Sequence, residues 1–228
     1  MYDDLKIFVG GTFAASRQGK YGVWRSDGVW LIEPKFEDVN RLSDGRYAAR
    51  MEGKYGVLLT DGTWLVEPLF EDLKPLTESH IVARAAGKYG VYDTRAKAWV
   101  VEPQSDEMCG FFDKYAIGIT DRLRTIFDAH TGEMLIGPRY NRLSLAFNDG
   151  LVAVRVGDKW GYADVHGDLV IPAQFRNMSM FRHGIAWGEH EGKVCPLDRR
   201  GRWVEGIPCV DPEPGELEDG FVPSLCGH

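Results

Sequence analysis

The phrase Trp30-Leu31-Ile32-Glu33-Pro34 returns as Trp64-Leu65-Val66-Glu67-Pro68 and again as Trp99-Val100-Val101-Glu102-Pro103. Weaker forms end at Pro138, Pro172 and Pro208, so successive prolines lie 34, 35, 35, 34 and 36 residues apart. A fixed step of this size is the signature of a repeat protein. It decides the fold, because each copy is one small unit that buries its apolar surface against its neighbours.

Two further markers keep the same phase. An aromatic residue precedes glycine at Tyr21-Gly22, Tyr55-Gly56, Tyr89-Gly90 and Trp160-Gly161. The equivalent positions in the other two copies have diverged to Arg124-Thr125 and Lys193-Val194. A phrase such as Phe36-Glu37-Asp38 opens each copy. The copies therefore cover about 2–35, 36–69, 70–104, 105–139, 140–174 and 175–209, with a partial copy at 210–225 and a tail at 226–228. We expect a single repeat domain over 1–225.

The second copy indicates what one unit contains. Residues 46–51 and 55–60 are strand-like runs, and Asp61-Gly62 after them is a strong hairpin signal, which predicts a type I′ turn with positive φ at both positions. Residues 63–67 are then a third strand, and we expect Pro68 to end it because proline lacks the N–H that a ladder needs. The sequence thus predicts an all-β chain of about six three-stranded antiparallel units.

Runs such as Tyr47-Ala48-Ala49 are apolar on both faces, so each small sheet is expected to be covered on both sides. A β-propeller and a stacked β-solenoid both bury their sheets in this way. We expect a β-propeller-like ring of six units. An open β-solenoid or superhelical array is the alternative, because residues 2–15 and 210–224 resemble each other instead of supplying complementary halves of one unit.

At these residues the chain resembles the WG-repeat family of bacterial proteins. The best match is the run from Gly157 to Phe175, which includes Lys159-Trp160-Gly161-Tyr162 and Val170-Ile171-Pro172. The first three copies carry tyrosine in place of tryptophan, and copies four and six depart most. The resemblance implies a β-repeat module of undefined role, with no family-wide catalytic residues to carry over.

Composition narrows the function class. The 228 residues are 44% apolar, 12% aromatic and 27% charged, as in ordinary globular proteins. The 27 basic and 34 acidic residues give a net charge of −7, which argues against a protein whose main role is to bind nucleic acid or an anionic membrane. No signal-peptide pattern or membrane-length apolar run is present, so we expect a cytoplasmic protein.

The four cysteines, Cys109, Cys195, Cys209 and Cys226, have wide and irregular spacing. Reduced thiols in a cytosolic protein are the expectation. The alternative is a disulfide or zinc role for Cys195, Cys209, Cys226 and His228.

Two rows of side chains are the candidate binding residues. Arg17, Arg50, Arg84 and Arg155 end the first strand of four copies and would form a basic stripe for a partner, although solvated or locally paired guanidinium groups are the favoured interpretation. Trp30, Trp64 and Trp99 share one position and would form a contact row for sugar or peptide, with core packing favoured instead. No catalytic residue, metal site or cofactor is predicted.

The uninterrupted repeat and the absence of catalytic motifs favour a non-catalytic protein-binding module. Its partner would be another protein, and a basic toxin or enzyme that the module inhibits, as an immunity protein does, is one candidate because the chain is acidic. The alternative is a lectin-like module for carbohydrate or another small ligand. A third hypothesis is an enzyme with a pocket at the repeat axis. The oligomeric state is left open.

Overall fold

The structure is a computed structural model of the chain, and it describes residues 4–8, 11–43, 45–111, 114–144 and 147–211. Two compact units divide it, one of residues 1–114 with 129–132 and the other of 115–128 with 133–228. The single-domain boundary at 1–225 stays a prediction. The described residues contain β-strands and no helix, and hence no helix that is long and apolar enough to cross a membrane.

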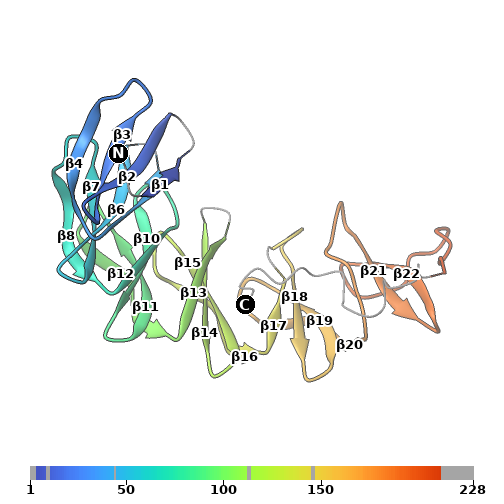
Figure 1. The fold of residues 1–228 in the computed structure, drawn as a ribbon. Helices are drawn as coiled ribbons and strands as arrows, with labels where there is room; N and C mark the ends of the chain where they lie inside the picture. Colours follow the sequence, from blue (N-terminus) through green and yellow to red (C-terminus); the bar gives the residue numbers. More distant parts are fainter. Residues whose placement is uncertain (1–3, 9–10, 44, 112–113, 145–146, 212–228) are drawn as a thin grey trace. The chain divides into compact units, whose positions relative to one another are not determined.

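The first unit contains three four-stranded antiparallel sheets, and the strands of each follow one another in chain order (Figure 1). The first sheet is β1 (Asp4–Ile7), β2 (Thr12–Arg17), β3 (Lys20–Arg25) and β4 (Trp30–Phe36); the second is β5 (Asp38–Ser43), β6 (Arg46–Met51), β7 (Lys54–Leu59) and β8 (Trp64–Phe70); the third is β9 (Asp72–Pro75), β10 (His80–Ala85), β11 (Lys88–Asp93) and β12 (Ala98–Ser105). Strand β13 (Glu107–Phe111) also belongs to this unit.

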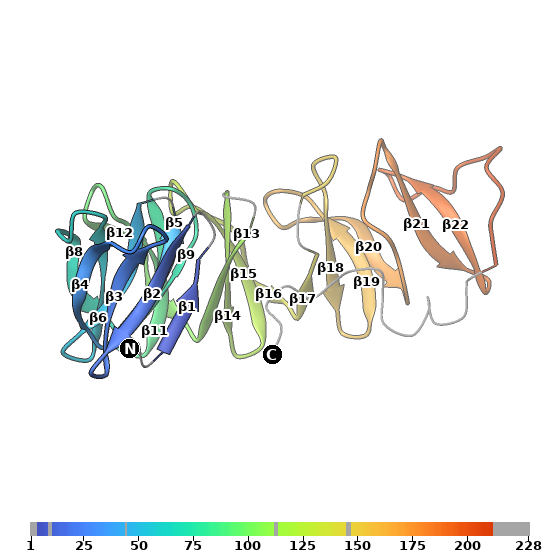
Figure 2. The same ribbon diagram turned by 45° about the horizontal axis from the view of Figure 1, so that its top comes forward.

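The second unit continues the pattern. It holds the antiparallel strands β14 (Tyr115–Thr120), β15 (Leu123–Asp128) and β16 (Met134–Tyr140); a four-stranded sheet of β17 (Arg142–Leu143), β18 (Val152–Val156), β19 (Lys159–Ala163) and β20 (Leu169–Phe175); and the hairpin of β21 (Ile185–His190) and β22 (Lys193–Asp198), drawn in orange in Figure 2. The predicted all-β class and the repeat of small antiparallel sheets are confirmed. The β-propeller-like ring and its alternative, an open superhelical array, both stay predictions.

The sheets β1–β4, β5–β8, β9–β12 and β17–β20 have four strands where the sequence predicted three. In the second sheet the extra strand begins at the aspartate of the Phe-Glu-Asp phrase, where the sequence predicted no strand. In the second sheet Asp38 pairs with Arg50 and Val39 with Ala49, so this segment lies outside the first hairpin strand. Pairing of β5 with β6 places the Val39 side chain in the core, where it is fully buried.

One feature explains both the aromatic-glycine and the glutamate-proline markers. Tyr55 pairs with Phe70, and Val57 pairs with Val66. An advance of two residues along β7 therefore corresponds to four residues along β8, so β8 forms a bulge opposite Gly56. A Cβ at Gly56 would lie 2.6 Å from the Val66 carbonyl oxygen. At Gly22, Gly90 and Gly161 the corresponding distances to the opposite carbonyl are 2.3, 2.3 and 2.5 Å. At these four positions only glycine leaves room for the close backbone approach. The β15–β16 pair has the corresponding register shifts with Thr125 at the glycine position.

The prediction that proline ends the strand is wrong, because β8 runs through Pro68 to Phe70. Pro68 lies in the bulge of a strand at the edge of its sheet, where no ladder hydrogen bond requires its nitrogen.

The prediction of a type I′ turn at Asp61-Gly62 is also wrong. Gly62 has φ +82° while Asp61 does not have a positive φ, and the N–H groups of Leu59 and Gly62 donate to the carbonyls of Thr63 and Leu59 at 2.9 and 3.0 Å. This is a three-residue loop that ends in a left-handed glycine. The two positive φ angles occur instead in the tighter hairpin before it, at Glu52 (51°) and Gly53 (76°).

The apolar core lies between consecutive sheets of a unit, as the two-sided apolar runs predicted. One cluster joins Ile32 and Phe36 of the first sheet to Tyr47 and Leu58 of the second. The rings of Phe36 and Trp64 meet edge to face across that boundary, with centroids 5.6 Å apart. Phe70 and Trp99 repeat the contact at 5.7 Å. Each sheet is therefore covered by its neighbour, which a single unit cannot achieve alone.

The expectation of reduced thiols is wrong. Cys195 and Cys209 form a disulfide with their Cα atoms 4.3 Å apart, and none of the described cysteines is free. The neighbouring Val194 and Val210 pair in an antiparallel bridge, which brings the two cysteines together although 14 positions separate them. Cys226 and His228 lie outside the described residues. Localisation in the cytoplasm stays a prediction.

Candidate functional site

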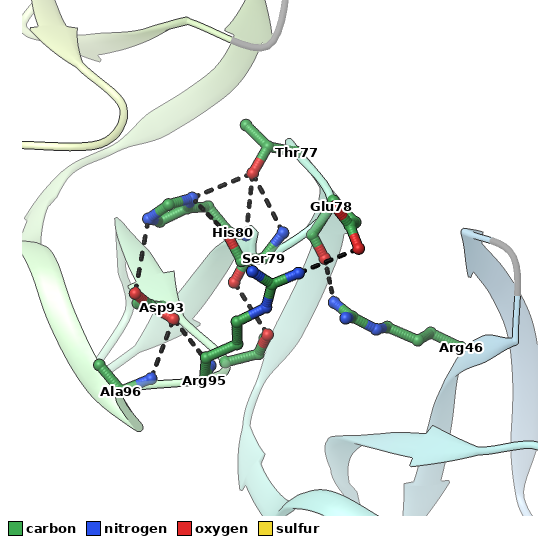
Figure 3. Close-up of polar contacts among 9 residues, drawn as sticks. Arg46, Thr77, Glu78, Ser79, His80, Asp93, Arg95 and Ala96 are labelled. Carbon is green, nitrogen blue, oxygen red and sulfur yellow. Dashed lines mark hydrogen bonds and ion pairs between the residues drawn. The ribbon is translucent and has the colours of Figure 1, made fainter.

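A hollow lies in the first unit, between the hairpins that open the second and third sheets. It has a volume of about 510 Å³. The apolar part of its wall is Leu42, Pro75 and Leu76, and the polar part is Ser43, Arg46, Thr77 and Glu78. The Arg46 side chain reaches from β6 toward the third sheet, where its Nη1 donates to the backbone carbonyl of Glu78 (Figure 3). We call this hollow the groove.

The loop that forms one wall of the groove is fixed by side-chain caps. The Thr77 hydroxyl oxygen accepts the backbone N–H groups of Ser79 at 3.2 Å and His80 at 3.0 Å. The Ser79 carbonyl accepts both the N–H and the hydroxyl of Thr94 at 2.8 Å. Ser79 stands where Gly45 of the second sheet has φ +72°, so this loop takes a different path from its counterpart. The wall is therefore held by several hydrogen bonds of its own and differs from its counterpart in the second sheet.

His80 lies beneath this loop with only 5% of its surface exposed. Its Nδ1 is 3.0 Å from Thr77 Oγ1 and 3.2 Å from Ser79 Oγ, and its Nε2 is 3.7 Å from Asp93 Oδ2. The ring of His130 packs edge to face on it at 5.1 Å. These contacts, most of which appear in Figure 3, hold the start of β10 in place.

Asp93 is held as an ion by its surroundings. Burial pushes the pKa of Asp93 up, but hydrogen bonds from the N–H groups of Ala96 and Arg95, at 3.0 and 2.7 Å, and electrostatic attraction to His80 and Arg95 outweigh it, so the pKa lies below its usual value. An ionised carboxylate beside His80 favours the tautomer with its proton on Nε2.

Threonine, histidine and aspartate in this order resemble a nucleophile, a base and its orienting acid. The hydrogen bonds assign them a different role. Thr77 Oγ1 accepts two backbone N–H groups and lies against His80 Nδ1, so its two lone pairs and its proton are all engaged. A hydroxyl in this state caps a turn and does not attack a substrate.

The predicted arginines Arg50 and Arg84 belong to a network that repeats in the second and third sheets. The guanidinium groups lie 5.7 and 5.6 Å from the ring centroids of Tyr55 and Tyr89. They also lie 3.6 and 3.8 Å from the carboxylates of Glu37 and Glu71. Arg17 is exposed and pairs with Glu33 at 3.7 Å. These three arginines are therefore locally paired.

The tyrosine of each network closes it by donating to an aspartate two strands away. Tyr55 donates to Asp38 and Tyr89 to Asp72, both at 2.8 Å. Burial, and then the hydrogen bond to the carboxylate, raises the pKa of each phenol to about 12. Within the described part of the chain, the fourth predicted arginine, Arg155, has no such network.

The predicted tryptophans lie in two different settings. Trp64 and Trp99 are half-buried against the cores between sheets, and Trp30 is half-buried at the start of β4. Trp64 also lines a second hollow of about 330 Å³, together with Met51, Glu52, Lys54, Glu67 and Pro68. The structure therefore does not bring the three tryptophans together as one site.

Sequence reasoning did not find the groove. Its residues lie at the strand ends and in the turn of two hairpins, outside the phrases that recur in every copy. The replacement of the loop glycine in the third copy was a weak signal, because the fourth copy also replaces it, by Lys114. Among the described residues, no three histidine, cysteine, aspartate or glutamate side chains gather as a metal site requires.

Residues 21–55, 128–160 and 160–193 match the family model of the WG containing repeat. The chain contains WG repeats. Each matched stretch covers about one repeat and starts at or near the step from aromatic residue to glycine, or at its eroded counterpart. Where this chain keeps the aromatic-glycine step of the WG repeat, the glycine marks the position at which the opposite strand bulges.

Solved structures give distant likenesses. They include Kluyveromyces lactis Hsv2, at 11% identity and a TM-score of 0.43 over 87% of this chain and 76% of that one. A eukaryotic initiation factor matches at 11% and 0.43, over 92% and 66%. PorZ, a surface component of the type-IX secretion system of Porphyromonas gingivalis, matches at 13% and 0.39, over 89% and 32%. Likenesses this distant carry no argument about function. A comparison with curated proteins finds no match.

Proposed function

We propose that the chain is a non-catalytic protein-binding module and that the groove receives a segment of its partner. The observation that carries the proposal is the composition of the groove. It sets the apolar side chains of Leu42, Pro75 and Leu76 beside the polar Ser43 and Glu78. Protein interfaces combine an apolar centre with a polar rim in the same way.

The hydrogen-bonded wall of the groove supports the same function. The loop from Thr77 to His80 is capped by its own hydrogen bonds and anchored by buried His80. A wall that is ordered before binding loses little conformational freedom when a partner docks. The complete engagement of the Thr77 hydroxyl supports a module without nucleophilic chemistry.

The proposal of a basic partner rests on charge alone. Five acidic residues and no basic one lie in 211–219, so residues 1–210 carry a net charge of only −2. Inhibition of a basic toxin or enzyme is therefore favoured by the composition of 211–219 and not by the groove. We keep it as a separate proposal about the partner's identity.

Charge reversal at the rim tests the groove. Glu78 is 78% exposed and pairs with Arg95 at 2.9 Å. A matched control is Glu33, which is 69% exposed, pairs with Arg17 at 3.7 Å and lies outside the groove lining. Both ion pairs are exposed, so either change costs little stability. Affinity capture from native lysate should recover a stoichiometric partner with the unchanged chain and with Glu33→Arg, but not with Glu78→Arg.

Equal recovery by both variants would show that the partner binds elsewhere. Recovery of no stoichiometric protein by the unchanged chain, at low and at moderate salt, would remove the proposal that the chain is a protein-binding module.

A second candidate function is lectin-like binding at the smaller hollow. Trp64 offers an aromatic face there, and Glu52, Lys54 and Glu67 offer polar groups. Quenching or enhancement of tryptophan fluorescence by members of a glycan panel, lost in Trp64→Leu, would support this function. No response to any sugar in the panel would remove it.

A further inference from the structure

The second and third sheets each carry one cross-strand row in which opposite charges meet. In the second sheet Asp38 pairs with Arg50 and Arg50 with Tyr55, so these three side chains stand in line on one face. The third sheet repeats the row as Asp72, Arg84 and Tyr89. The adjoining Glu37 and Glu71 add a second carboxylate to each arginine. In both rows the arginine is neutralised by acids of its own sheet.

The corresponding row in the sheet β17–β20 contains no acidic residue. Arg142 pairs with Arg155, and Arg155 pairs with Trp160, in the register that Asp38, Arg50 and Tyr55 occupy. The position of Glu37 is taken by Asn141, whose Nδ2 donates to the Gly157 carbonyl at 3.1 Å. Two arginines thus stand directly opposite each other where an aspartate and an arginine stand in the second sheet.

No described residue neutralises this pair. Among residues 4–211, outside the undescribed gaps, neither Arg142 nor Arg155 forms an ion pair or hydrogen bond with an acidic side chain. The buried Nε of Arg155 has no hydrogen-bond partner; Arg84 Nε shares this state but has the Glu71 carboxylate at 3.8 Å. Like charges placed opposite each other in a sheet destabilise it, and a buried donor without a partner costs free energy. Binding of an anion would remove both costs.

The other copies indicate which anion fits. At the position of Arg155, Arg50 and Arg84 each lie beside a glutamate carboxylate, and at the position of Arg142 the same rows hold an aspartate. We propose that Arg142 and Arg155 bind a carboxylate supplied by an acidic segment of a protein partner. Two guanidinium groups present parallel N–H donors, which suit the two oxygens of a carboxylate. This site lies within the second unit and does not depend on the groove.

A labelled peptide of glutamate residues separated by glycines is the probe, with binding followed by fluorescence anisotropy at low and at physiological salt. We expect the full chain to bind it and each of Arg142→Gln and Arg155→Gln to weaken binding roughly tenfold, the effect of losing one charge-assisted contact. Arg50→Gln is the matched control, because it removes the same positive charge from the same row position where Glu37 already neutralises it. It should bind the peptide as the unchanged chain does.

Arg142→Asp supplies a readout that separates binding from folding. It recreates the row of the second sheet, so it should abolish peptide binding while raising the thermal midpoint of unfolding. Equal weakening by Arg50→Gln and Arg155→Gln would show unspecific charge attraction and overturn the proposal. Displacement of the peptide by inorganic phosphate at lower concentrations than by acetate would also overturn it, in favour of a phosphate site.

Discussion

Gly56→Ala tests whether the bulge of β8 imposes the glycine of the WG repeat. The added Cβ would lie 2.6 Å from the Val66 carbonyl oxygen, 2.8 Å from the Trp64 ring and 2.9 Å from the Glu67 carbonyl carbon. Two of these three contacts are with backbone atoms, which cannot rotate away. Overpacking of this kind costs about 3 kcal/mol. For a chain of this size that is a fall of about 6–12 °C in the thermal midpoint.

The assay is thermal unfolding followed by circular dichroism and by tryptophan fluorescence. Gly137→Ala in β16 is the control, because its Cβ would lie at an ordinary contact distance of 3.7 Å from Met134 Sδ and Gly137 has no positive φ. There alanine lowers the entropy of the unfolded chain, so stability should change by less than about 1 kcal/mol. A Gly56→Ala chain as stable as the control would refute the claim that the bulge requires glycine.

Three further predictions concern other parts of the repeat. The pKa of Tyr55 is raised from 10.0 to about 12, so the folded state favours the neutral phenol. Its contribution to stability is therefore present below about pH 10 and is lost as pH rises toward 12. Ultraviolet titration should show Tyr55 ionising at higher pH than a free tyrosine, and Asp38→Asn should lower the pH at which it ionises. Replacing Cys195 and Cys209 by serine opens a loop of 14 residues and should lower the free energy of unfolding by about 3 kcal/mol in denaturant titration. His80→Ala removes a buried ring and its hydrogen bonds, and should lower the free energy of unfolding by about 2 kcal/mol and speed amide hydrogen exchange in the adjoining loop.

The sequence predicted the parts of the fold that recur in every copy. The proline step placed the repeat boundaries within a residue or two of the sheets, because Phe36 and Phe70 end their strands where one copy passes to the next. It missed the fourth strand, since β5 buries only Val39 fully and its sequence, Asp38 to Ser43, does not alternate apolar and polar residues. It also assigned the type I′ turn to the wrong hairpin, because Asp-Gly suits a left-handed glycine in either kind of loop.

The candidate sites were harder to predict, because they depend on what each copy does differently. Arg50 and Arg155 occupy the same position in the repeat and share a residue type. What separates them is the neighbour across the strand, Asp38 in one sheet and Arg142 in the other. That pairing requires the fourth strand, which the sequence did not reveal. The Cys195–Cys209 disulfide depends on an isolated bridge between Val194 and Val210, for which no sequence pattern exists.

Photo-crosslinking from within the groove tests the proposed function most directly. A photoreactive amino acid in place of Ser43 lies in the groove lining, and the same amino acid in place of the exposed Ser26 lies in a turn outside it. In native lysate, the account predicts one protein crosslinked from position 43 and none of that protein from position 26. Crosslinking of the same proteins from both positions, or of none from position 43, would contradict it.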